Sequence, residues 1–220
     1  MTGKMHYMYI PWPKVYPILD VSFIPPTHRG DFLYRLGSSL ADAGVTMLEY
    51  RNKTGAEAEL LADAEILRAV LPAGQVKLIL DDRADLVKKV NFDGAHVDAG
   101  DLSPTEARRL LGPKYILGTF GGSSEFIPEI LEEPADYFSV GPVFPTRTKQ
   151  LSTPPIGIEG VRKLCEIAGE NTVLVAVGGI TLPTAAQALA AGARMVAVAG
   201  AIFRQPDPAA EFRRWMAELG

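Results

Sequence analysis

The chain has 220 residues, of which 47% are hydrophobic and 22% are charged, as is typical of a globular protein that buries a sizeable core. Its formal net charge of −4, without any block of basic residues, argues against a nucleic-acid surface. No segment approaches the roughly 18 unbroken apolar residues of a membrane-spanning helix, and the single cysteine, which cannot form an internal disulfide, favours a reducing, cytoplasmic compartment.

Apolar runs and amphipathic periods alternate along the chain after an irregular, proline-broken arm at residues 1–15. Near-continuous apolar runs predict strands at 16–21, 45–51, 76–81, 93–98, 115–120, 135–141, 172–179 and 193–200. Apolar residues three to four positions apart predict helices at 31–44, 55–71, 83–90, 103–112, 123–133, 157–169, 181–192 and 207–220. Ser103 and Pro104 are expected at the N-cap and first turn of their helix.

These eight strand–helix units follow one another about every 25 residues without a linker, which predicts a single α/β domain, a (β/α)₈ TIM barrel, at 16–220. The apolar runs suit parallel strands that are buried on both faces. The alternative is an open, doubly wound sheet. That fold predicts fewer units and a glycine-rich phosphate loop after the first strand, where the sequence reads LDVSFIPP.

Charged residues gather where the predicted strands end, which is where this fold places its active site. After the second strand, alternation points Glu49, Arg51 and Lys53 to one side and Tyr50 and Asn52 to the other. Cations that gather at this end of the barrel are stabilised by an anion, and they indicate an anionic small-molecule substrate.

Carboxylates follow the third and fourth strands. Asp82 and Asp101 lie at the ends of neighbouring strands, and hard oxygen ligands of this kind suit Mg²⁺ bound together with substrate phosphates. The alternative is that they pair with Arg83, with Arg51 or with a helix N-terminus. His96 has two interpretations as well, a packed residue at a strand end or a direct acid–base group.

Glycines close the last two predicted strands. Gly178 and Gly179 precede one helix, and Gly200 precedes another. Glycines at these two strand ends allow the backbone to approach a phosphate, and the loops after strands seven and eight are the usual phosphate site of the fold. The alternative is that they are ordinary turn glycines.

Several motifs in order resemble the thiamine phosphate synthase family, also called thiamine-phosphate pyrophosphorylase, from about Tyr16 to Leu219. The most specific is "VGPVFPTRTK" at 140–149, which is similar to the family's "GPVFPTxTK". "EYRNK", "DDRADLV", "DGAHVDAGDL" and "AVGGI" are similar to "QxRxK", "NDRxDLA", "DGVHLGQxDL" and "AIGGI".

The resemblance implies an enzyme, a Mg²⁺-dependent transferase of thiamine biosynthesis. It joins 4-amino-5-hydroxymethyl-2-methylpyrimidine diphosphate to a thiazole phosphate and releases diphosphate. Matched residue by residue, Asp82 and Asp101 would hold the metal, and Arg51, Lys53 and Lys149 would act on the diphosphate. The remaining substrate-binding positions would be Glu49, Asp81, Thr146, Thr148, Gly178, Gly179, Ala199 and Gly200.

The chain departs from the family pattern at two of these positions and at two positions after the fifth predicted strand. Glu49 replaces a glutamine, Asp81 replaces an asparagine, and Phe120 and Gly122 stand where the family shows a serine and a histidine. Each added carboxylate that faces the diphosphate costs affinity unless a cation or a proton offsets its charge. Glu49 still offers an acceptor for the pyrimidine amino group.

Two other functions are weighed against the synthase. One is a thiazole tautomerase on the same barrel, which needs a histidine acid–base group but no metal. The other is a non-catalytic paralogue that binds a thiamine-related phosphate. The retained "DDR" and "TRTK" elements favour the synthase. The expected partners are small-molecule substrates, without nucleic acid or membrane, and a homo-oligomer is left open.

Overall fold

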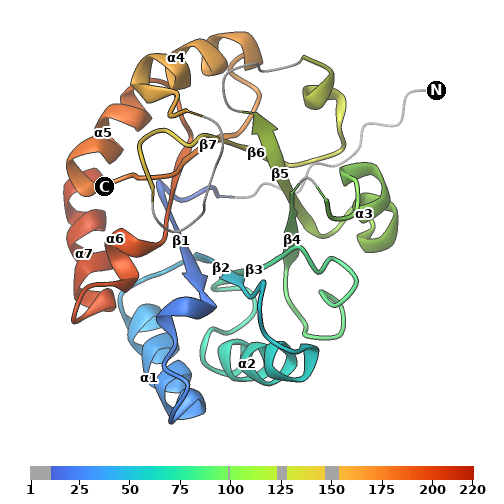
Figure 1. Cartoon of the computed structure of the whole chain (residues 1–220), viewed down its shortest axis with the longest axis vertical. Helices are drawn as coiled ribbons and strands as arrows, with labels where there is room; N and C mark the ends of the chain where they lie inside the picture. Colours follow the sequence, from blue (N-terminus) through green and yellow to red (C-terminus); the bar gives the residue numbers. More distant parts are fainter. Residues whose placement is uncertain (1–10, 99, 123–127, 147–153) are drawn as a thin grey trace.

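Eight parallel strands close into a barrel in the computed structural model, which describes residues 11–98, 100–122, 128–146 and 154–220. Each strand pairs with the next along the chain, and β8 pairs back with β1 (Figure 1). The strands are β1 (Val15–Asp20), β2 (Met47–Arg51), β3 (Lys77–Asp81), β4 (Gly94–Val97), β5 (Ile116–Gly122), β6 (Tyr137–Val140), β7 (Leu174–Val177) and β8 (Met195–Val198). The predicted (β/α)₈ barrel is confirmed, and the open sheet is excluded.

Helices surround the barrel on its outer face (Figure 1). They are α1 (Arg29–Asp42), α2 (Glu57–Val70), α3 (Pro104–Leu111), α4 (Gly157–Ala168), α5 (Leu182–Ala190), α6 (Gly200–Phe203) and α7 (Pro208–Leu219), with short 3₁₀ helices η1 (Val21–Phe23) and η2 (Pro128–Glu132). The start of α3 is as predicted, because the Ser103 side chain accepts a hydrogen bond from the backbone of Glu106, and the Glu106 carboxylate accepts one in return. The short helix α6 after β8 was not predicted.

The segment 83–90 does not form the predicted helix and instead consists of consecutive turns. The hydrogen bond from Leu86 N to Arg83 O, 2.9 Å long, is of the turn type. β3 ends at Asp81 and β4 begins at Gly94, and a helix confined to the short stretch between them is only marginally stable on its own. The apolar side chains that suggested a helix are buried all the same, beneath the turns.

The predicted helix at 123–133 lies only partly within the described residues. Its second part forms the 3₁₀ helix η2, and residues 123–127 lie outside the described part of the chain. At the beginning, β1 includes Val15, one residue before the predicted start of the barrel domain. Lys14 Nζ donates to the backbone carbonyl oxygens of Leu219 and Gly220, at 2.5 and 3.2 Å.

The first halves of the strands enclose an apolar layer inside the barrel. This layer consists of Tyr16, Met47, Ile79, Ile116, Tyr137, Val175, Met195 and Ala197. Trp12 packs against it, with its ring edge-on to Tyr137 at a centroid distance of 5.7 Å. The interior is therefore a packed core at the amino ends of the strands. A polar site has room only at their carboxyl ends.

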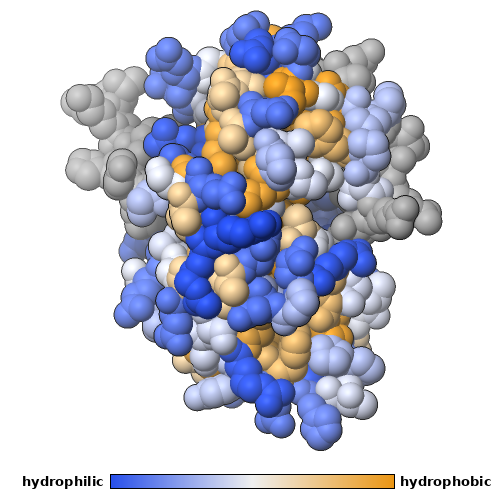
Figure 2. Space-filling model, turned by 90° about the vertical axis from the view of Figure 1, so that its left-hand side faces the viewer, coloured by the Kyte–Doolittle hydropathy of each residue, from blue (hydrophilic) through white to orange (hydrophobic). Residues whose placement is uncertain are grey.

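A second, larger core lies between the strands and the surrounding helices, where side chains such as Leu48, Leu67 and Trp215 are fully buried. Figure 2 shows the outer face on the side of α1, α5 and α7 as mostly hydrophilic, with smaller hydrophobic patches between the polar side chains. Among the described residues, no helix has both the length and the apolar character needed to cross a bilayer.

Candidate active site at the carboxyl ends of the strands

Alternation along β2 sends its side chains to opposite sides of the barrel wall. Glu49 points inward, where its carboxylate accepts a hydrogen bond of 2.7 Å from Tyr16 of β1. Tyr50 points outward, where its hydroxyl donates to Asp63 of α2. Arg51 returns to the inward side. The predicted division of these residues is therefore confirmed.

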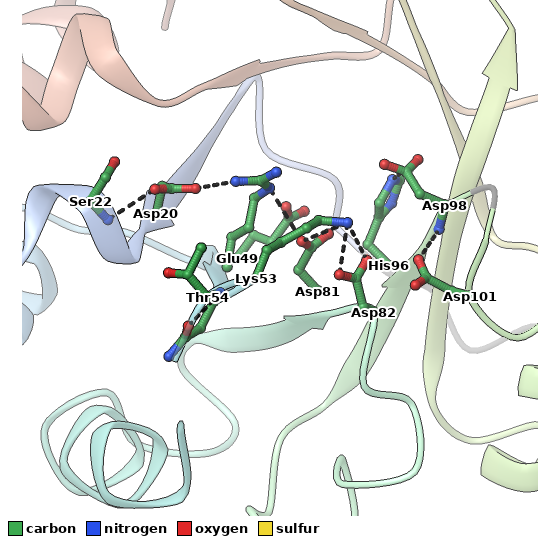
Figure 3. A network of polar contacts seen from close by, with 12 residues as sticks. Asp20, Ser22, Glu49, Lys53, Thr54, Asp81, Asp82, His96, Asp98 and Asp101 are labelled. Carbon is green, nitrogen blue, oxygen red and sulfur yellow. Dashed lines mark hydrogen bonds and ion pairs between the residues drawn. The ribbon is translucent and has the colours of Figure 1, made fainter. Parts of the chain in front are cut away.

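Arg51 lies between two carboxylates that end the neighbouring strands. It donates through Nη1 to Asp20, the last residue of β1, and its Nε lies 3.3 Å from Oδ2 of Asp81, the last residue of β3 (Figure 3). Burial lowers the pKa of Arg51, but the charges of Asp81 and Asp20 raise it overall, so the guanidinium remains charged. Asp20 was not predicted as a site residue, although its position at the same strand end was a usable signal.

Lys53 extends from the loop after β2 toward the end of β3. Its Nζ donates to Asp82 at 2.7 Å and lies 3.7 Å from Oδ2 of Asp81 (Figure 3). Burial lowers the pKa of Lys53, and the carboxylates of Asp81 and Asp82 raise it overall. Oδ2 of Asp81 is buried without a hydrogen-bond partner within the described residues. The charge of this oxygen is met by the two cations rather than by a hydrogen bond.

Asp82 and Asp101 come together beside Lys53, as predicted. Asp82 has a left-handed backbone, with φ of +64°, and its N–H donates to the carbonyl of His96, which fixes the end of β3 on β4. Asp101 accepts a hydrogen bond of 2.9 Å from the backbone of Asp98. Burial raises the pKa of Asp101, and hydrogen bonding to Asp82 raises it further. A carboxyl group whose ionisation is disfavoured by a neighbouring carboxylate is chemically suited to share a cation with it.

This pair offers two oxygen-bearing side chains rather than a complete set of metal ligands. Across the ranges that the structure describes, no group of three or more histidine, cysteine, aspartate or glutamate residues is arranged to hold a metal ion. Mg²⁺ usually takes one or two carboxylates and completes its coordination with water and substrate phosphates. Asp82 and Asp101 fit that requirement. Asp82 also forms an ion pair with Lys53. Part of the alternative, in which these carboxylates form salt bridges, is therefore present, although Lys53 was not among the expected partners.

The mouth of the barrel is its opening at the carboxyl ends of the strands. Below it, a buried chain of hydrogen bonds joins Glu49 to His96. The hydroxyl of Tyr16, which contacts Glu49, lies 3.0 Å from that of Tyr137, which in turn lies 3.2 Å from Nδ1 of His96. Nε2 of His96 lies 3.4 Å from Oγ of Ser139, and the imidazole stacks on the Tyr137 ring. The two tyrosines were not predicted. A polar aromatic residue at an inward position of an otherwise apolar strand was the signal available.

Burial shapes the ionisation of the acidic groups in this chain. It raises the pKa of Glu49 above its usual range, and with the charges of Glu49 and Asp82 it raises the pKa of Asp81 to about 8. Burial lowers the pKa of His96, but Asp98 and Glu49 outweigh it and raise the value to about 8. The negative charge of Glu49 and Asp81, which stand where the family has amides, is thus partly neutralised by bound protons and by the charged imidazole of His96.

The predicted phosphate-binding glycines lie at the ends of β7 and β8. Gly178 and Gly179 have φ of +94° and +67°, and a Cβ atom on Gly179 would lie only 2.6 Å from the carbonyl oxygen of Pro145. Ala199 and Gly200 precede and begin α6. Because β7 and β8 are neighbours in the barrel, both backbone turns open on the same part of the mouth.

The proline-rich loop after β6 packs on the glycines of β7. Phe144 N donates to the carbonyl oxygen of Gly178 at 2.9 Å, which brings the described part of the loop to the mouth. Thr146, half-buried, is the last described residue of this part. Thr148 and Lys149, predicted to bind the two substrates, lie outside the described residues.

The end of β5 departs from a regular strand. Its pairing with β6 shifts between Phe120 and Gly122, where a bulge places one extra residue on β5. Phe120 is 36% exposed, so it is a partly open aromatic surface rather than a core residue. Gly122 has φ of +123°, a conformation that favours glycine.

Sequence and structure comparisons relate the chain to enzymes of one kind. The model of the thiamine monophosphate synthase family matches residues 16–202. A thiamine-phosphate synthase of Koribacter versatilis is 36% identical over 91% of this chain and 94% of its own length. A thiamine-phosphate synthase of Chlorobium phaeovibrioides is 34% identical over 75% of this chain and 78% of its own length. Two Synechococcus relatives are longer, and this chain spans about half of them, 48% and 46%.

A solved structure agrees with these relatives. The thiamine phosphate pyrophosphorylase of Pyrococcus furiosus superposes on 94% of this chain and 95% of its own, with a TM-score of 0.79 and 26% identity. The chain belongs to the thiamine monophosphate synthase family.

Proposed function

We propose that the chain couples 4-amino-5-hydroxymethyl-2-methylpyrimidine diphosphate to a thiazole phosphate, forming thiamine phosphate and diphosphate. The observation that carries this proposal is the convergence of Arg51, Lys53, Asp82 and Asp101 at one end of the barrel in a chain of this family. Cations and carboxylates in this combination suit a diphosphate that arrives with a divalent metal.

Arg51 and Lys53 would bind the diphosphate and stabilise the charge that develops on it as the bond to the pyrimidine methylene breaks. Both cations have raised pKa values and remain charged at neutral pH. In the unliganded protein they are paired with Asp20, Asp81 and Asp82. Binding therefore exchanges part of this pairing for contacts with the substrate. Lys149 would act on the same group, as the motif implies.

Asp82 and Asp101 would hold Mg²⁺, which when bound supplies positive charge to the leaving diphosphate. The raised pKa of Asp101 beside Asp82 supports this assignment, because a cation shared by the two side chains would favour the ionised form of Asp101. Glu49 and Asp81, farther inside, would accept hydrogen bonds from the pyrimidine. Oδ2 of Asp81, which is ion-paired with Arg51 and Lys53 but has no hydrogen-bond partner among the described residues, retains acceptor capacity for such a donor.

The thiazole phosphate would bind on the opposite side of the mouth, at Thr146, Thr148, Gly178, Gly179, Ala199 and Gly200. The open backbone turns after β7 and β8 support this site. The thiazole nitrogen would then attack the pyrimidine methylene carbon as diphosphate leaves, so that one C–N bond forms and one C–O bond breaks. Holding the two substrates together supplies the rest of the catalysis, without a protein nucleophile.

The test is to incubate the protein with the pyrimidine diphosphate, thiazole phosphate and Mg²⁺, and to measure thiamine phosphate. Turnover that is lost in Asp82→Ala and Lys149→Ala supports the proposal. Binding of both substrates without turnover contradicts it and indicates a non-catalytic paralogue. A cytoplasmic location is proposed with it, because a chain with one cysteine, half-buried Cys165, suits a reducing compartment.

A further inference from the structure

The side of β2 that faces away from the barrel carries a second polar network, here called the outer network. Its members are Arg29, Tyr50, Asn52, Glu59 and Asp63. They come from α1, from β2 and the loop after it, and from α2. The mechanism proposed above uses none of them, but the loop that they hold carries Lys53.

The outer network has a rigid, buried base. The carboxylate of Asp63 on α2 is 3% exposed and accepts a hydrogen bond of 2.8 Å from Nε of Arg29 on α1. Tyr50 donates its hydroxyl to the same carboxylate from β2. Burial raises the pKa of Tyr50, and Asp63 raises it further, so the hydroxyl keeps its proton. Three elements are thereby joined at one charge-assisted site.

Asn52 connects this base to the loop. Its Nδ2 donates to the hydroxyl oxygen of Tyr50 at 3.1 Å and to Glu59 at 3.3 Å. Its Oδ1 accepts from the backbone N–H of Gly55 at 2.6 Å and of Thr54 at 3.3 Å. Since the Tyr50 proton is directed to Asp63, the orientation of the Asn52 amide is determined: nitrogen toward Tyr50 and oxygen toward the loop.

The loop closes tightly around the Asn52 side chain. A Cβ atom on Gly55 would lie 2.5 Å from Nδ2 of Asn52 and 2.4 Å from Oε1 of Glu59, so a larger residue there would displace these side chains. Lys53 lies within this turn, and its side chain extends toward the barrel. Figure 3 shows Lys53 extending toward Asp82, with Thr54 on the other side of the loop.

We propose that Asn52 is a positioning residue for diphosphate binding, because it fixes the loop from which Lys53 reaches the mouth. A lysine on a fixed loop loses less conformational freedom when it binds an anion than one on a loose loop. This inference rests on the proposed function, in which Lys53 contacts the diphosphate. Asn52 acts through Lys53 and touches no substrate itself.

The experiment measures inorganic diphosphate binding by calorimetry in the presence of Mg²⁺, for wild type, Asn52→Ala, Lys53→Ala and the double variant. Asn52→Ala is expected to weaken diphosphate binding about threefold to tenfold and to leave thiazole phosphate binding unchanged. In the Lys53→Ala background, Asn52→Ala should have almost no further effect, because the group that it positions is missing.

Asn91→Ala is the matched control, since it removes the same atoms from a turn before β4, at the other end of the barrel. It should lower the melting temperature without changing diphosphate binding. Equal losses from Asn52→Ala in both backgrounds, or equal losses for both ligands, overturn the inference. If Lys53→Ala binds diphosphate normally, both the role of Lys53 and this inference are wrong. If Lys53→Ala weakens binding and Asn52→Ala does not, only the inference is wrong.

Discussion

The ring of Tyr137 occupies the space that a side chain on Gly118 would need. A Cβ atom at position 118 would lie 2.0 Å from Cζ of Tyr137 and 2.4 Å from its hydroxyl oxygen. The missing side chain on β5 thus lets the tyrosine of β6 lie inside the barrel, between Tyr16 and His96. The buried hydrogen-bonded chain under the mouth depends on this space.

Gly118→Ala should therefore lower the free energy of unfolding by about 3 kcal/mol, because the overpacked ring must move. Urea unfolding measures this change. Gly74→Ala is the control, since its turn has φ of +88° but no atom within 4 Å of the added carbon, and it should cost only about 1 kcal/mol. Equal costs at the two positions would show that the ring adjusts freely.

Arg51→Lys should reduce kcat/KM for the pyrimidine diphosphate about 100-fold. A lysine has a single donor nitrogen, whereas the guanidinium reaches Asp20 through Nη1 and Asp81 through the separate Nε. Steady-state kinetics with saturating thiazole phosphate measures the effect, and Arg35→Lys on the exposed side of α1 serves as the control. Wild-type kinetics in Arg51→Lys would remove Arg51 from the diphosphate site.

Asp82→Asn and Asp101→Asn should each raise the Mg²⁺ concentration needed for half-maximal activity about tenfold or more. Each change removes one anionic oxygen ligand while keeping the size of the side chain. Titration of activity with Mg²⁺ after treatment with a chelator measures the shift. Asp85→Asn should behave as wild type, because Asp85 pairs with Arg83 on the exposed turn after β3. An unchanged Mg²⁺ dependence in both variants would contradict the metal assignment.

The free energy of unfolding should fall as pH rises from 6.5 to 8 in the protein without metal or substrate. The pKa of His96 is about 8 in the folded protein and 6.5 without its neighbours, so in this range the folded state holds a proton that the unfolded chain has released. The raised pKa of Asp81 acts in the same direction, because its carboxyl group also binds a proton more tightly when folded. The expected decrease is on the order of 1–2 kcal/mol.

Urea unfolding at a series of pH values measures this slope. His96→Asn should make the slope shallower and leave the contribution of Asp81. A stability that rises between pH 6.5 and 8 would mean that His96 is neutral in the folded protein. That result would leave the carboxylates around it without the positive charge described above.

The fold could be predicted because each strand carries its own signal, a short apolar run followed by polar residues. The same regularity predicted that Glu49, Arg51 and Lys53 share one side, since alternation is a local property of the strand. It failed at 83–90, where the apolar spacing of a helix was present but the short connection from Asp81 to Gly94 forms turns. A helix of this length is marginal on its own, and the spacing of apolar residues does not show whether tertiary packing will stabilise it.

The site was only partly predictable for a related reason. Asp82 and Asp101 stand at strand ends and were expected to meet, and the structure places them beside Lys53. Tyr16 and Tyr137 sit within apolar strands, where an aromatic residue is ordinarily core. Their role depends on the hydroxyl-to-hydroxyl distance across the barrel, which only the closed arrangement of the strands determines.

The contact of Lys14 with the carbonyls of Leu219 and Gly220 places the beginning of β1 beside the end of α7. With β1 also paired to β8, the order of the eight units is a cycle, and where the cycle is opened is arbitrary for the barrel. A circular permutant that joins Gly220 to Lys14 through a short linker, and starts instead at Lys114 before β5, should keep every strand pair. Its mouth would then be assembled by a chain that begins on the opposite side of the ring.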